Sequence, residues 1–455
     1  MEIKALATAM IGYGLPKDSL ERGIEKNPDF IGSDMGSTDS GPYFLGSGDI
    51  KDTTLLKKDL ELVITAGLKK GIPVLMGSAG TAGTDVQLQK VIDIIKEIGR
   101  EKSLHFKLAA IHSEIDKNYL KEKLKEGKIT PLVEEKVGSY NPSLSSSDID
   151  DTEHIVAQLG PEPFIKALKE GAQVVVAGRS CDTSIFAALP MMEGFDRGLN
   201  MHMAKVIECA SLCARPSSRD AIMGYLREDS VLFESQNPDL KCTAESIAEH
   251  SLYERENPYY QVEPGGTLDM TESSYEQYNE RIAKVAGSKW IPSPTYMVKL
   301  EGARKGGYRS LTMAGVRDPI MISQIDNIVE IVLNTVKSIL DDYVYGKDYS
   351  IRFRIYGKNG VMNKLEIKKE ITSHEIFILV DVVGKTPQIS KSACTIAKQK
   401  LLHCHYKGIL ATAGNLAYPF SPDTIHTGIT YNFNIYHLLE LKDPYEVFPI
   451  EIINV

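Results

Sequence analysis

Acidic side chains follow short apolar runs at several places in the first half of the chain: Asp34, Asp39, Asp85, Glu114 and Asp182. Carboxyl groups that converge in one cleft can exchange protons with a substrate as an acid and base pair, or bind Mg²⁺ or Mn²⁺. Asp34 is the strongest candidate, because it ends the run 29–34 and no helix begins directly after it. We select Asp34, Asp39 and Asp182 as catalytic candidates, and Asp34 with Glu114 as candidate ligands of a divalent metal ion. The alternative for Asp85 and Asp182 is that they only cap the helices that follow them.

A glycine-rich loop, GSAGTAGTD at 77–85, precedes a predicted helix. Backbone N–H groups at such a position can hold a phosphate or a carboxylate. The spacing G-x-x-G-x-x-G matches neither the dinucleotide fingerprint nor the phosphate loop of ATP-binding proteins, which disfavours NAD and ATP. The alternative is a tight turn before a capped helix. The substrate-binding candidates from this loop and from 32–42 are Gly36, Ser37, Thr38, Gly77, Ser78, Gly80, Thr81 and Gly83.

Other side chains extend this candidate site. Arg179 can hold a carboxylate or phosphate through two parallel hydrogen bonds. His112 ends a predicted strand and is a candidate acid or base. Four charged residues from later in the chain are expected to reach over the same cleft: Arg227, Glu228, Asp229 and Glu263. Arg227 would assist substrate binding, and the alternative for all four is surface ion pairing. Cys181 is disfavoured as a nucleophile, because no histidine partner lies near it in the sequence.

Predicted strands and helices alternate through the first half of the chain, which predicts βαβ units in a doubly wound, mainly parallel, Rossmann-like sheet. In such a sheet ligands bind outside the carboxyl ends of the strands, where the candidate loops lie. The polar segment 134–154 is interpreted as an insertion. The predicted strands are 3–12, 29–34, 71–78, 105–114 and 172–180, and the predicted helices are 17–26, 53–70, 84–102, 117–127 and 153–171.

The pattern of elements changes after residue 216. We expect an N-terminal α/β domain at 1–216, a connecting region of strands, helix and loops at 217–294, and a C-terminal α+β domain at 295–455. The last domain reads as two strands within 295–318, a long helix, two strands and a helix. This order predicts a ferredoxin-like layer.

Composition excludes several classes of protein. The chain has 455 residues, a formal net charge of -9 and no block of basic residues, so nucleic acid is not expected as a partner. Neither a signal-peptide pattern nor a run of about 18 apolar residues is present, which predicts a cytoplasmic protein without a membrane partner. Six cysteines without a C-x-x-C pair fit neither a disulfide framework nor a zinc ribbon. A homo-oligomer is expected.

Several long segments together resemble the acyclic terpene utilisation family, the AtuA-like proteins. The resemblance implies a place in the bacterial catabolism of acyclic terpenes and related branched acids, alongside acyl-CoA enzymes. It carries no settled catalytic residues. The segments are 12–48, 71–85, 177–216, 226–230, 262–271, 298–322 and 412–425.

Two functional hypotheses follow. The first is a catabolic lyase, hydratase or isomerase that acts on a small carboxylate or an acyl-CoA, with its anionic group held by the glycine loops and Arg179. The second is a non-catalytic ligand-binding or scaffolding subunit of an acyl-CoA-processing complex, suggested by the apolar loop LAYPF at 416–420 and by the α+β tail. A dehydrogenase is disfavoured by the glycine spacing.

Overall fold

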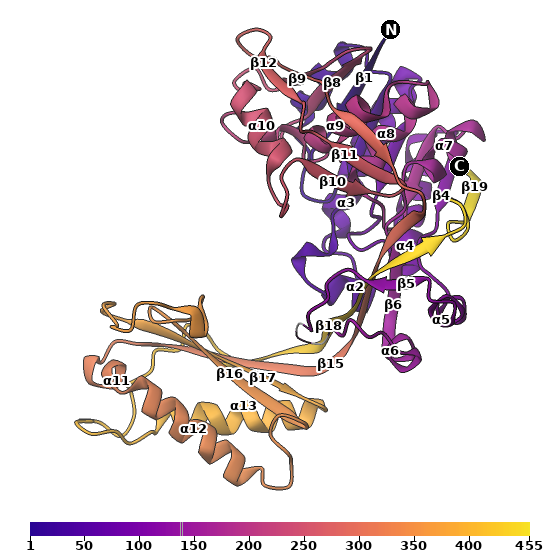
Figure 1. The fold of residues 1–455 in the computed structure, drawn as a ribbon. Coiled ribbons are helices and arrows are strands. Elements are labelled where there is room, and N and C mark those ends of the chain that lie inside the picture. Colours follow the sequence, from indigo (N-terminus) through magenta and orange to yellow (C-terminus); the bar gives the residue numbers. More distant parts are fainter. Residues whose placement is uncertain (137, 139) are drawn as a thin grey trace. The chain divides into compact units, whose positions relative to one another are not determined.

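The computed structural model describes residues 1–136, 138 and 140–455. It divides into two compact units: unit 1 consists of residues 1–304 and 433–455, and unit 2 of residues 305–432. Figure 1 labels their elements. Residues 137 and 139 of the predicted insertion 134–154 lie outside the described residues. Within the described residues, none of the helices combines the length and the apolar character that a membrane span requires.

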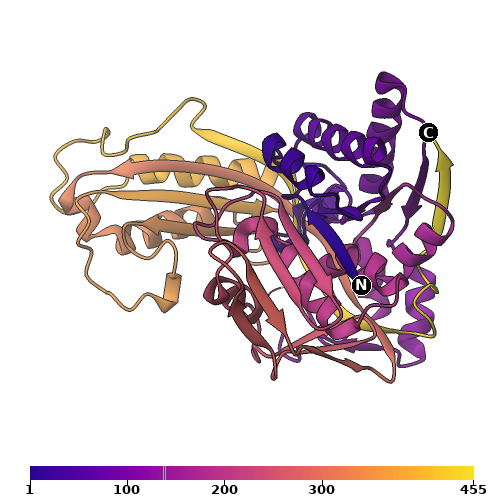
Figure 2. The same ribbon diagram turned by 90° about the horizontal axis from the view of Figure 1, so that it is seen from above.

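The main sheet of unit 1 is mixed, with parallel strands at its centre. Its strands are β1 (Glu2–Ala7), β2 (Phe30–Asp34), β3 (Val74–Gly77), β4 (Lys107–Ile111), β7 (Val174–Ala177), β8 (Ile222–Arg227), β9 (Val231–Ser235), β12 (Ser274–Gln277), β13 (Ala283–Ala286) and β19 (Ile450–Asn454). Their order is β12-β13-β9-β8-β1-β2-β3-β7-β4-β19. The run from β1 to β4 is parallel, while β8 and β19 join it antiparallel. Figure 2 shows β19 in yellow beside the purple strand at this edge. The α/β prediction is confirmed.

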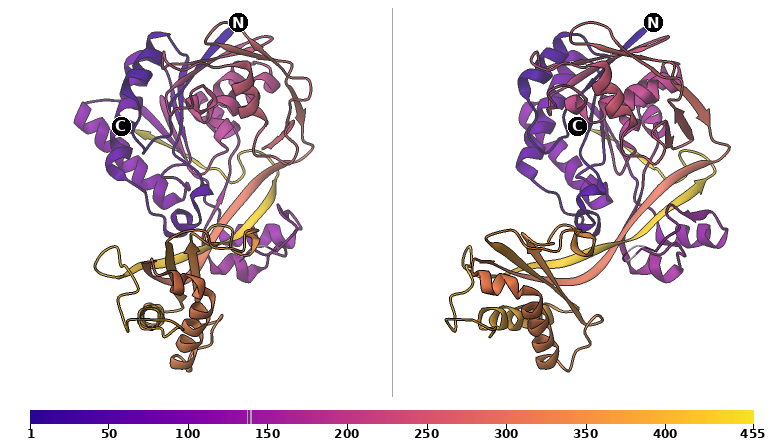
Figure 3. Two further views of the ribbon diagram at one scale, coloured as in Figure 1. Left: turned by 90° about the vertical axis from the view of Figure 1, so that its left-hand side faces the viewer. Right: turned by 60° about the vertical axis from the view of Figure 1, so that its left-hand side comes forward.

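Helices cover both faces of this sheet, because alternate residues of the central strands belong to two separate cores. In β1, Ala5 packs in one core and Leu6 in the other. Helices α1 (Lys17–Glu25), α3 (Thr53–Lys70) and α4 (Asp85–Lys102) cover the Leu6 face, and α7 (Glu162–Lys169), α8 (Asp182–Met192) and α9 (Arg197–Ile207) cover the Ala5 face. In both views of Figure 3 the indigo helices lie on one side of the central strands and the magenta helices on the other.

The remaining elements of unit 1 extend or cover the sheet. Residues 217–294 are more than a connection, since they supply β8, β9, β12 and β13 to the main sheet. The further elements are α2 (Tyr43–Ser47), α5 (Lys117–Lys125), α6 (Ser146–Asp151), α10 (Ala244–Leu252), β5 (Ile129–Pro131), β6 (Thr152–Ala157), β10 (Tyr260–Glu263), β11 (Gly266–Asp269), β14 (Lys289–Pro292) and the 3₁₀ helices η1 (Thr38–Ser40) and η2 (Ala210–Cys213). Strands β10, β11 and β14 form a separate antiparallel sheet.

The prediction of one helix over 153–171 is wrong for its first part. Residues Thr152–Ala157 form strand β6, and only Glu162–Lys169 is helical. Strand β6 pairs antiparallel with residues 300–304, which supply the backbone partners that the local sequence does not reveal. Its pairing with a distant strand therefore overrides local helix propensity.

Unit 2 is an antiparallel sheet with helices on one face. Strands β15 (Tyr296–Val316) and β18 (Thr424–Leu441) belong to unit 2 only in the parts that lie within residues 305–432. The other elements of unit 2 are β16 (Tyr349–Tyr356), β17 (Ile376–Gly384), α11 (Pro319–Ser323), α12 (Ile325–Ile339), α13 (Pro387–Leu402) and the 3₁₀ helix η3 (Asn363–Leu365). The strand order is β16-β17-β15-β18. Ile328 and Val332 of α12 share a core with Ile378 of β17, and Figure 1 shows α12 and α13 on one side of β16 and β17. The ferredoxin-like assignment stays a prediction.

The two strands predicted within 295–318 are a single strand, β15. The glycine pair at 306–307 does not reverse the chain, although Gly307 has a positive φ of 121°. Instead the strand changes its partner, from β6 at residues 300–304 to β17 at residues 308–316. A glycine pair within a strand therefore marks a change of pairing here.

Candidate functional site

Helix α8 begins at the carboxyl end of β7 with an N-terminus that no side chain caps. Its N-cap residue, Cys181, makes no capping hydrogen bond. Helix α4, which begins at the same edge of the sheet, is closed by Thr84, whose hydroxyl accepts from the N–H of Gln87. Because the first N–H groups of a helix have no partner inside the helix, α8 offers hydrogen-bond donors at this edge.

Asp34 ends β2 on the face that α8 covers. A side chain at Gly32 would lie 2.3 Å from the Phe186 ring of α8, and alternation along the strand puts Asp34 on the same face. Asp34 is 5% exposed; its Oδ2 accepts from the N–H of Gly36 at 2.8 Å, and its Oδ1 has no partner. Burial, and then the neighbouring Asp182 carboxylate, raise the pKa of Asp34 well above its ordinary value, against a smaller lowering by Arg179. Asp34 therefore resists ionisation.

Ser180 supplies a second buried polar atom without a partner. Its side chain is fully buried, and its Oγ makes no hydrogen bond. The hydroxyl lies over Gly77, where a Cβ would come within 2.3 Å of it. Gly77 pairs in register with Asp34, so the Asp34 and Ser180 side chains lie over neighbouring strands on the α8 face. Two unsatisfied polar groups thus lie near the uncapped helix end.

Asp182 is the carboxyl of this group that solvent reaches. It occupies the first turn of α8, and its side chain is 36% exposed. Its Oδ1 lies 3.5 Å from Nη1 of Arg179. Desolvation raises the pKa of Asp182, while the cations Arg179 and Lys205 oppose the shift. Asp34 and Asp182 therefore form a pair of carboxyls that disfavours a double negative charge.

Arg179 is held on several sides by the protein itself. Its Nε donates to Glu301 Oε2 at 2.8 Å, and its Nη1 donates to Ser78 Oγ at 3.0 Å. With its amide oxygen turned toward the guanidinium, Gln158 accepts from Nη2 at 2.6 Å. The predicted anchor of the substrate carboxylate is thus paired with an internal carboxylate, and its role in substrate binding stays a prediction.

Glu301, on β15, is a central residue that the sequence analysis does not identify. It is 2% exposed and also accepts from Lys299 Nζ and from Thr38 Oγ1, both at 3.0 Å. Burial alone would raise its pKa, but Arg179 and Lys299 lower the pKa of Glu301 to about 2. The alternation of Lys299 and Glu301 within the apolar strand VKLEG is the signal that could have indicated it. Through Glu301 the predicted binding residue Thr38 joins the cluster.

A buried ion pair on α9 is also absent from the predictions. Lys205 is 5% exposed, and its Nζ lies 2.6 Å from Glu208 Oε1. Burial raises the pKa of Glu208 to about 8, opposed by Lys205. The Lys205 ammonium also opposes the upward pKa shifts of Asp182 and Glu263. Several carboxyl groups near the N-terminus of α8 therefore interact with the same cation, Lys205.

Cys181 is held as a thiol. Its Sγ donates to Glu263 Oε2 at 3.0 Å, and Thr183 donates to the same oxygen at 2.9 Å. Burial, and then the Glu263 charge, raise the pKa of Cys181 well above its ordinary value. Since the thiolate is the nucleophilic form, this environment agrees with the reading that Cys181 is no nucleophile. Glu263 reaches the α8 end as expected.

His112 and Glu114 form a separate cluster at the end of β4. His112 Nδ1 lies 2.8 Å from Asp85 Oδ1, and Glu114 bonds the N–H of Asp85 at 2.8 Å and His154 Nδ1 at 2.6 Å. The hydrogen bond to Asp85 raises the pKa of His112, against burial. Strands β3 and β7 separate β4 from β2, so the ends of β2 and β4 lie about 14 Å apart at ~4.8 Å per strand. Glu114 follows the end of β4 and contacts Asp85 and His154 rather than Asp34.

No group of three or more His, Cys, Asp or Glu side chains within residues 1–136, 138 and 140–455 is arranged to hold a metal ion. The metal ion and its predicted ligands Asp34 and Glu114 stay a prediction.

The other predicted residues lie at varying distances from Asp34. Asp39, exposed in η1, accepts from Ser37 Oγ at 2.7 Å, and its charge contributes to the raised pKa of Asp182. Gly36 donates to Asp34 as described. Arg227 pairs with Glu2 at 2.7 Å, at the first residue of β1, and so lies at the opposite edge of the parallel strands. The structure does not bring Arg227 to the cluster.

Most backbone N–H groups of residues 79–85 donate to acceptors within the protein. The N–H of Thr81 donates to the Ser78 carbonyl, and the side chain of Gln87 accepts from residues 82 and 84. Gly83 has a φ of 69°, and a Cβ there would lie 2.0 Å from the Arg179 nitrogen. Gly80 also has a positive φ. The geometry is that of a tight turn before a capped helix, and the anion-binding role of this loop stays a prediction.

The loop after β1 is filled by a buried carboxylate. Asp59 of α3 is fully buried and accepts from the backbone N–H groups of Gly12 at 2.8 Å, Tyr13 at 3.2 Å, Gly14 at 2.9 Å and Leu15 at 2.9 Å. This strand end therefore offers no open donors at those positions.

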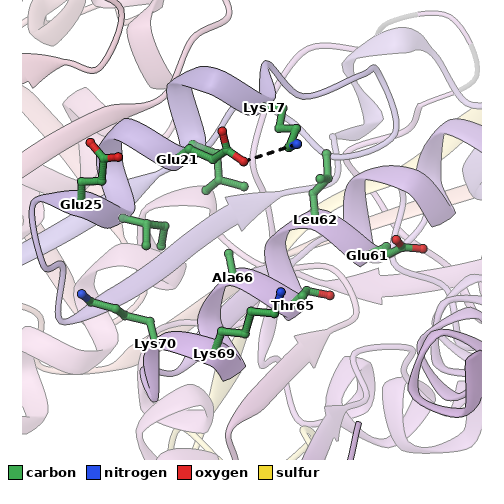
Figure 4. Close-up of a pocket in the computed structure, with 11 residues that line it drawn as sticks. Lys17, Glu21, Glu25, Glu61, Leu62, Thr65, Ala66, Lys69 and Lys70 are labelled. Atoms are coloured by element: carbon green, nitrogen blue, oxygen red, sulfur yellow. Dashed lines mark ion pairs between the residues drawn. The ribbon is translucent and has the colours of Figure 1, made fainter. Parts of the chain in front are cut away.

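A surface groove of about 550 Å³ lies between α1 and α3, on the face of the sheet opposite α8. Figure 4 shows charged side chains along its rims and the ion pair of Lys17 with Glu21, which measures 3.4 Å. The groove contains none of the candidate residues. It is lined by Lys17, Leu20, Glu21, Ile24, Glu25, Glu61, Leu62, Thr65, Ala66, Lys69 and Lys70.

Comparison with known proteins gives one finding at the level of a family. The model of the acyclic terpene utilisation family protein AtuA matches residues 51–215 and 229–422. The matched residues include Arg179, Asp182 and Glu301, and they begin after Asp34. No curated protein and no solved structure matches the chain.

Proposed function

The chain belongs to the acyclic terpene utilisation family, and from this premise we propose that it is an enzyme in the catabolism of acyclic terpenes and related branched acids. The proposed reaction is that of a lyase, hydratase or isomerase on a small carboxylate or an acyl-CoA. The observation that carries the proposal is the buried Asp34 carboxyl, whose Oδ1 has no partner beside the uncapped N-terminus of α8.

Asp34 and Asp182 supply the proposed acid and base. Burial and the Asp182 charge raise the pKa of Asp34 well above its ordinary value, so Asp34 is the better proton donor near neutral pH. Asp182 is more exposed and lies beside Arg179, so it is the better proton acceptor. Two carboxyls whose environments differ in this way can serve as acid and base in one step.

The uncapped end of α8 supports the same reading. Hydrations, eliminations and isomerisations next to a carbonyl pass through an enolate-like state, in which negative charge develops on the oxygen. Helix N-terminal N–H groups stabilise such charge. Arg179 positions this end through Ser78 and Asp182.

The test is turnover on a panel of unsaturated and hydroxylated branched acyl-CoAs and the corresponding free acids, followed by mass spectrometry. D34N and D182N should each lower kcat by about 100-fold or more. D116N, which alters a helix cap on α5, is the matched control and should leave kcat unchanged. The melting temperatures report whether each variant is folded.

Unchanged turnover in both D34N and D182N would refute the assignment. Absence of turnover in the wild type, together with stable co-purification of an acyl-CoA enzyme, would instead support the scaffolding or ligand-binding subunit.

A further inference from the structure

We infer that the reacting group of the substrate is an uncharged carbonyl, such as a thioester, ketone or aldehyde, whose oxygen accepts hydrogen bonds from Asp34 and Ser180. This inference rests on the proposed function and excludes a free carboxylate at the reacting end.

Three of the cations near the α8 end, Arg179, Lys205 and Lys299, are already paired. Arg179 and Lys299 both contact Glu301, at 2.8 Å and 3.0 Å, and Lys205 contacts Glu208 at 2.6 Å. Arg179 and Lys205 are the cations that lower the pKa of Asp182. A free carboxylate at this position would have to displace Glu301 from Arg179 or Glu208 from Lys205, at the cost of leaving a buried acid unpaired.

Carboxyl groups surround the same position. Asp182 occupies the first turn of α8, Asp34 lies on its face of the sheet, and Glu263 bonds Cys181 and Thr183 at its start. A carboxylate ligand would raise the local negative charge further, which like charges oppose. A neutral carbonyl carries no such penalty.

The unpartnered atoms match a carbonyl oxygen. Asp34 Oδ2 already accepts from the N–H of Gly36, so a proton on Oδ1 is free to be donated. The Ser180 hydroxyl is a second donor on the neighbouring strand, and the α8 N–H groups are donors of the same kind. Polar groups buried to this degree without partners are costly, and a bound acceptor oxygen would satisfy both.

The experiment compares two probes that share a carbon skeleton and differ at the carbonyl. One is the N-acetylcysteamine thioester of isovaleric acid, which is neutral, and the other is isovalerate. Isothermal titration of the full chain should give at least tenfold tighter binding of the thioester. D182N should reduce this difference by improving the affinity for isovalerate, because it removes a nearby negative charge.

Variants at the donors test the contact itself. D34N should bind the thioester within about threefold of wild type, because the amide keeps an N–H donor, whereas D34L should weaken binding about tenfold. Since leucine adds apolar bulk to a buried position, S180A provides the same test without added volume and should also weaken binding. Melting curves establish that each variant is folded.

Isovalerate binding as tight as the thioester would overturn the inference, as would wild-type affinity in both D34L and S180A. Failure of the thioester to bind at about 1 mM, a free energy near -4 kcal/mol, would overturn it as well. The proposed function can fail separately from this inference. Preferred binding of the neutral thioester without any turnover would contradict the enzyme function and leave the inference of an uncharged carbonyl standing. Turnover of a free carboxylate at its carboxyl end would contradict the inference and leave the enzyme function standing.

Discussion

Asp59 and Asp34 are buried carboxyls at the same edge of the parallel strands, and their surroundings differ in one respect. Asp59 accepts from the backbone N–H groups of residues 12–15, so both of its oxygens are satisfied. Asp34 accepts from Gly36 through one oxygen and leaves the other without a partner. A satisfied buried carboxylate stabilises the loop that it holds, whereas an unsatisfied one destabilises the fold and is available to a ligand.

The difference separates structural strand ends from candidate functional ones. The sequence shows glycine and acidic residues at both places, so the composition of a loop does not distinguish them. The distinction lies in whether the donors and acceptors are used within the protein. By this criterion the ends of β1 and β3 are structural, and the ends of β2 and β7 form the candidate site.

The largest expected effect is on stability at Asp59. D59A leaves the N–H groups of residues 12–15 without their acceptor, and should lower the free energy of unfolding by about 3–5 kcal/mol. Urea denaturation followed by circular dichroism measures it. D52A, which removes the N-cap of the same helix α3, should cost about 1 kcal/mol. Equal losses in the two variants would contradict the structural role of Asp59.

A smaller effect is expected where the glycine loop contacts Arg179. G83A places a Cβ 2.0 Å from the Arg179 nitrogen, and should cost about 2–4 kcal/mol through overpacking and the positive φ. G14A is the matched control: its φ of 84° is also positive, but nothing lies within 4 Å of the added Cβ. It should therefore cost only about 1–2 kcal/mol. A thermal denaturation series that ranks G14A below G83A in stability would refute this reading.

The smallest effect concerns the pH dependence contributed by Asp34. Its pKa is raised in the folded protein, so above the ordinary pKa of about 3.9 the unfolded chain releases a proton that the folded chain keeps. The contribution of Asp34 to the free energy of unfolding should consequently fall as the pH rises from about 4 toward neutrality. D34N lacks this contribution, so the wild type should lose stability relative to D34N as the pH rises over this range.

Denaturation curves at several pH values test this, with D116N as a control that keeps the wild-type trend. A wild type that gains stability relative to D34N with rising pH would show that Asp34 ionises readily in the folded protein.

The central strands and the convergence of Asp34, Arg179 and Asp182 could be predicted from the sequence. Parallel strands that are buried on both faces read as continuous apolar runs, and their carboxyl ends must share one edge. Thr38 follows β2 at the same edge of the sheet and donates to Glu301. These predictions depend on local pattern and on topology alone.

Glu301 and Lys205 could not be predicted in the same way. Glu301 lies 122 residues after Arg179 on a strand whose partner, β6, reads as part of a helix. Its role depends on which distant strands pair, and a single sequence gives little information about that pairing. Lys205 lies on α9, in which residues 198–207 are all buried, whereas a lysine in a helix is ordinarily expected to be exposed to solvent.

The return of the chain from unit 2 to unit 1 affects the order in which the protein can fold during synthesis. Strand β4 pairs on its outer side with β19, at residues 450–454, which are synthesised after every other described strand of the sheet. Until then β4 is an open edge, able to pair with strands of other chains. Strand β19 therefore covers the edge of β4, and a chain truncated before residue 450 would expose β4 and be prone to aggregation.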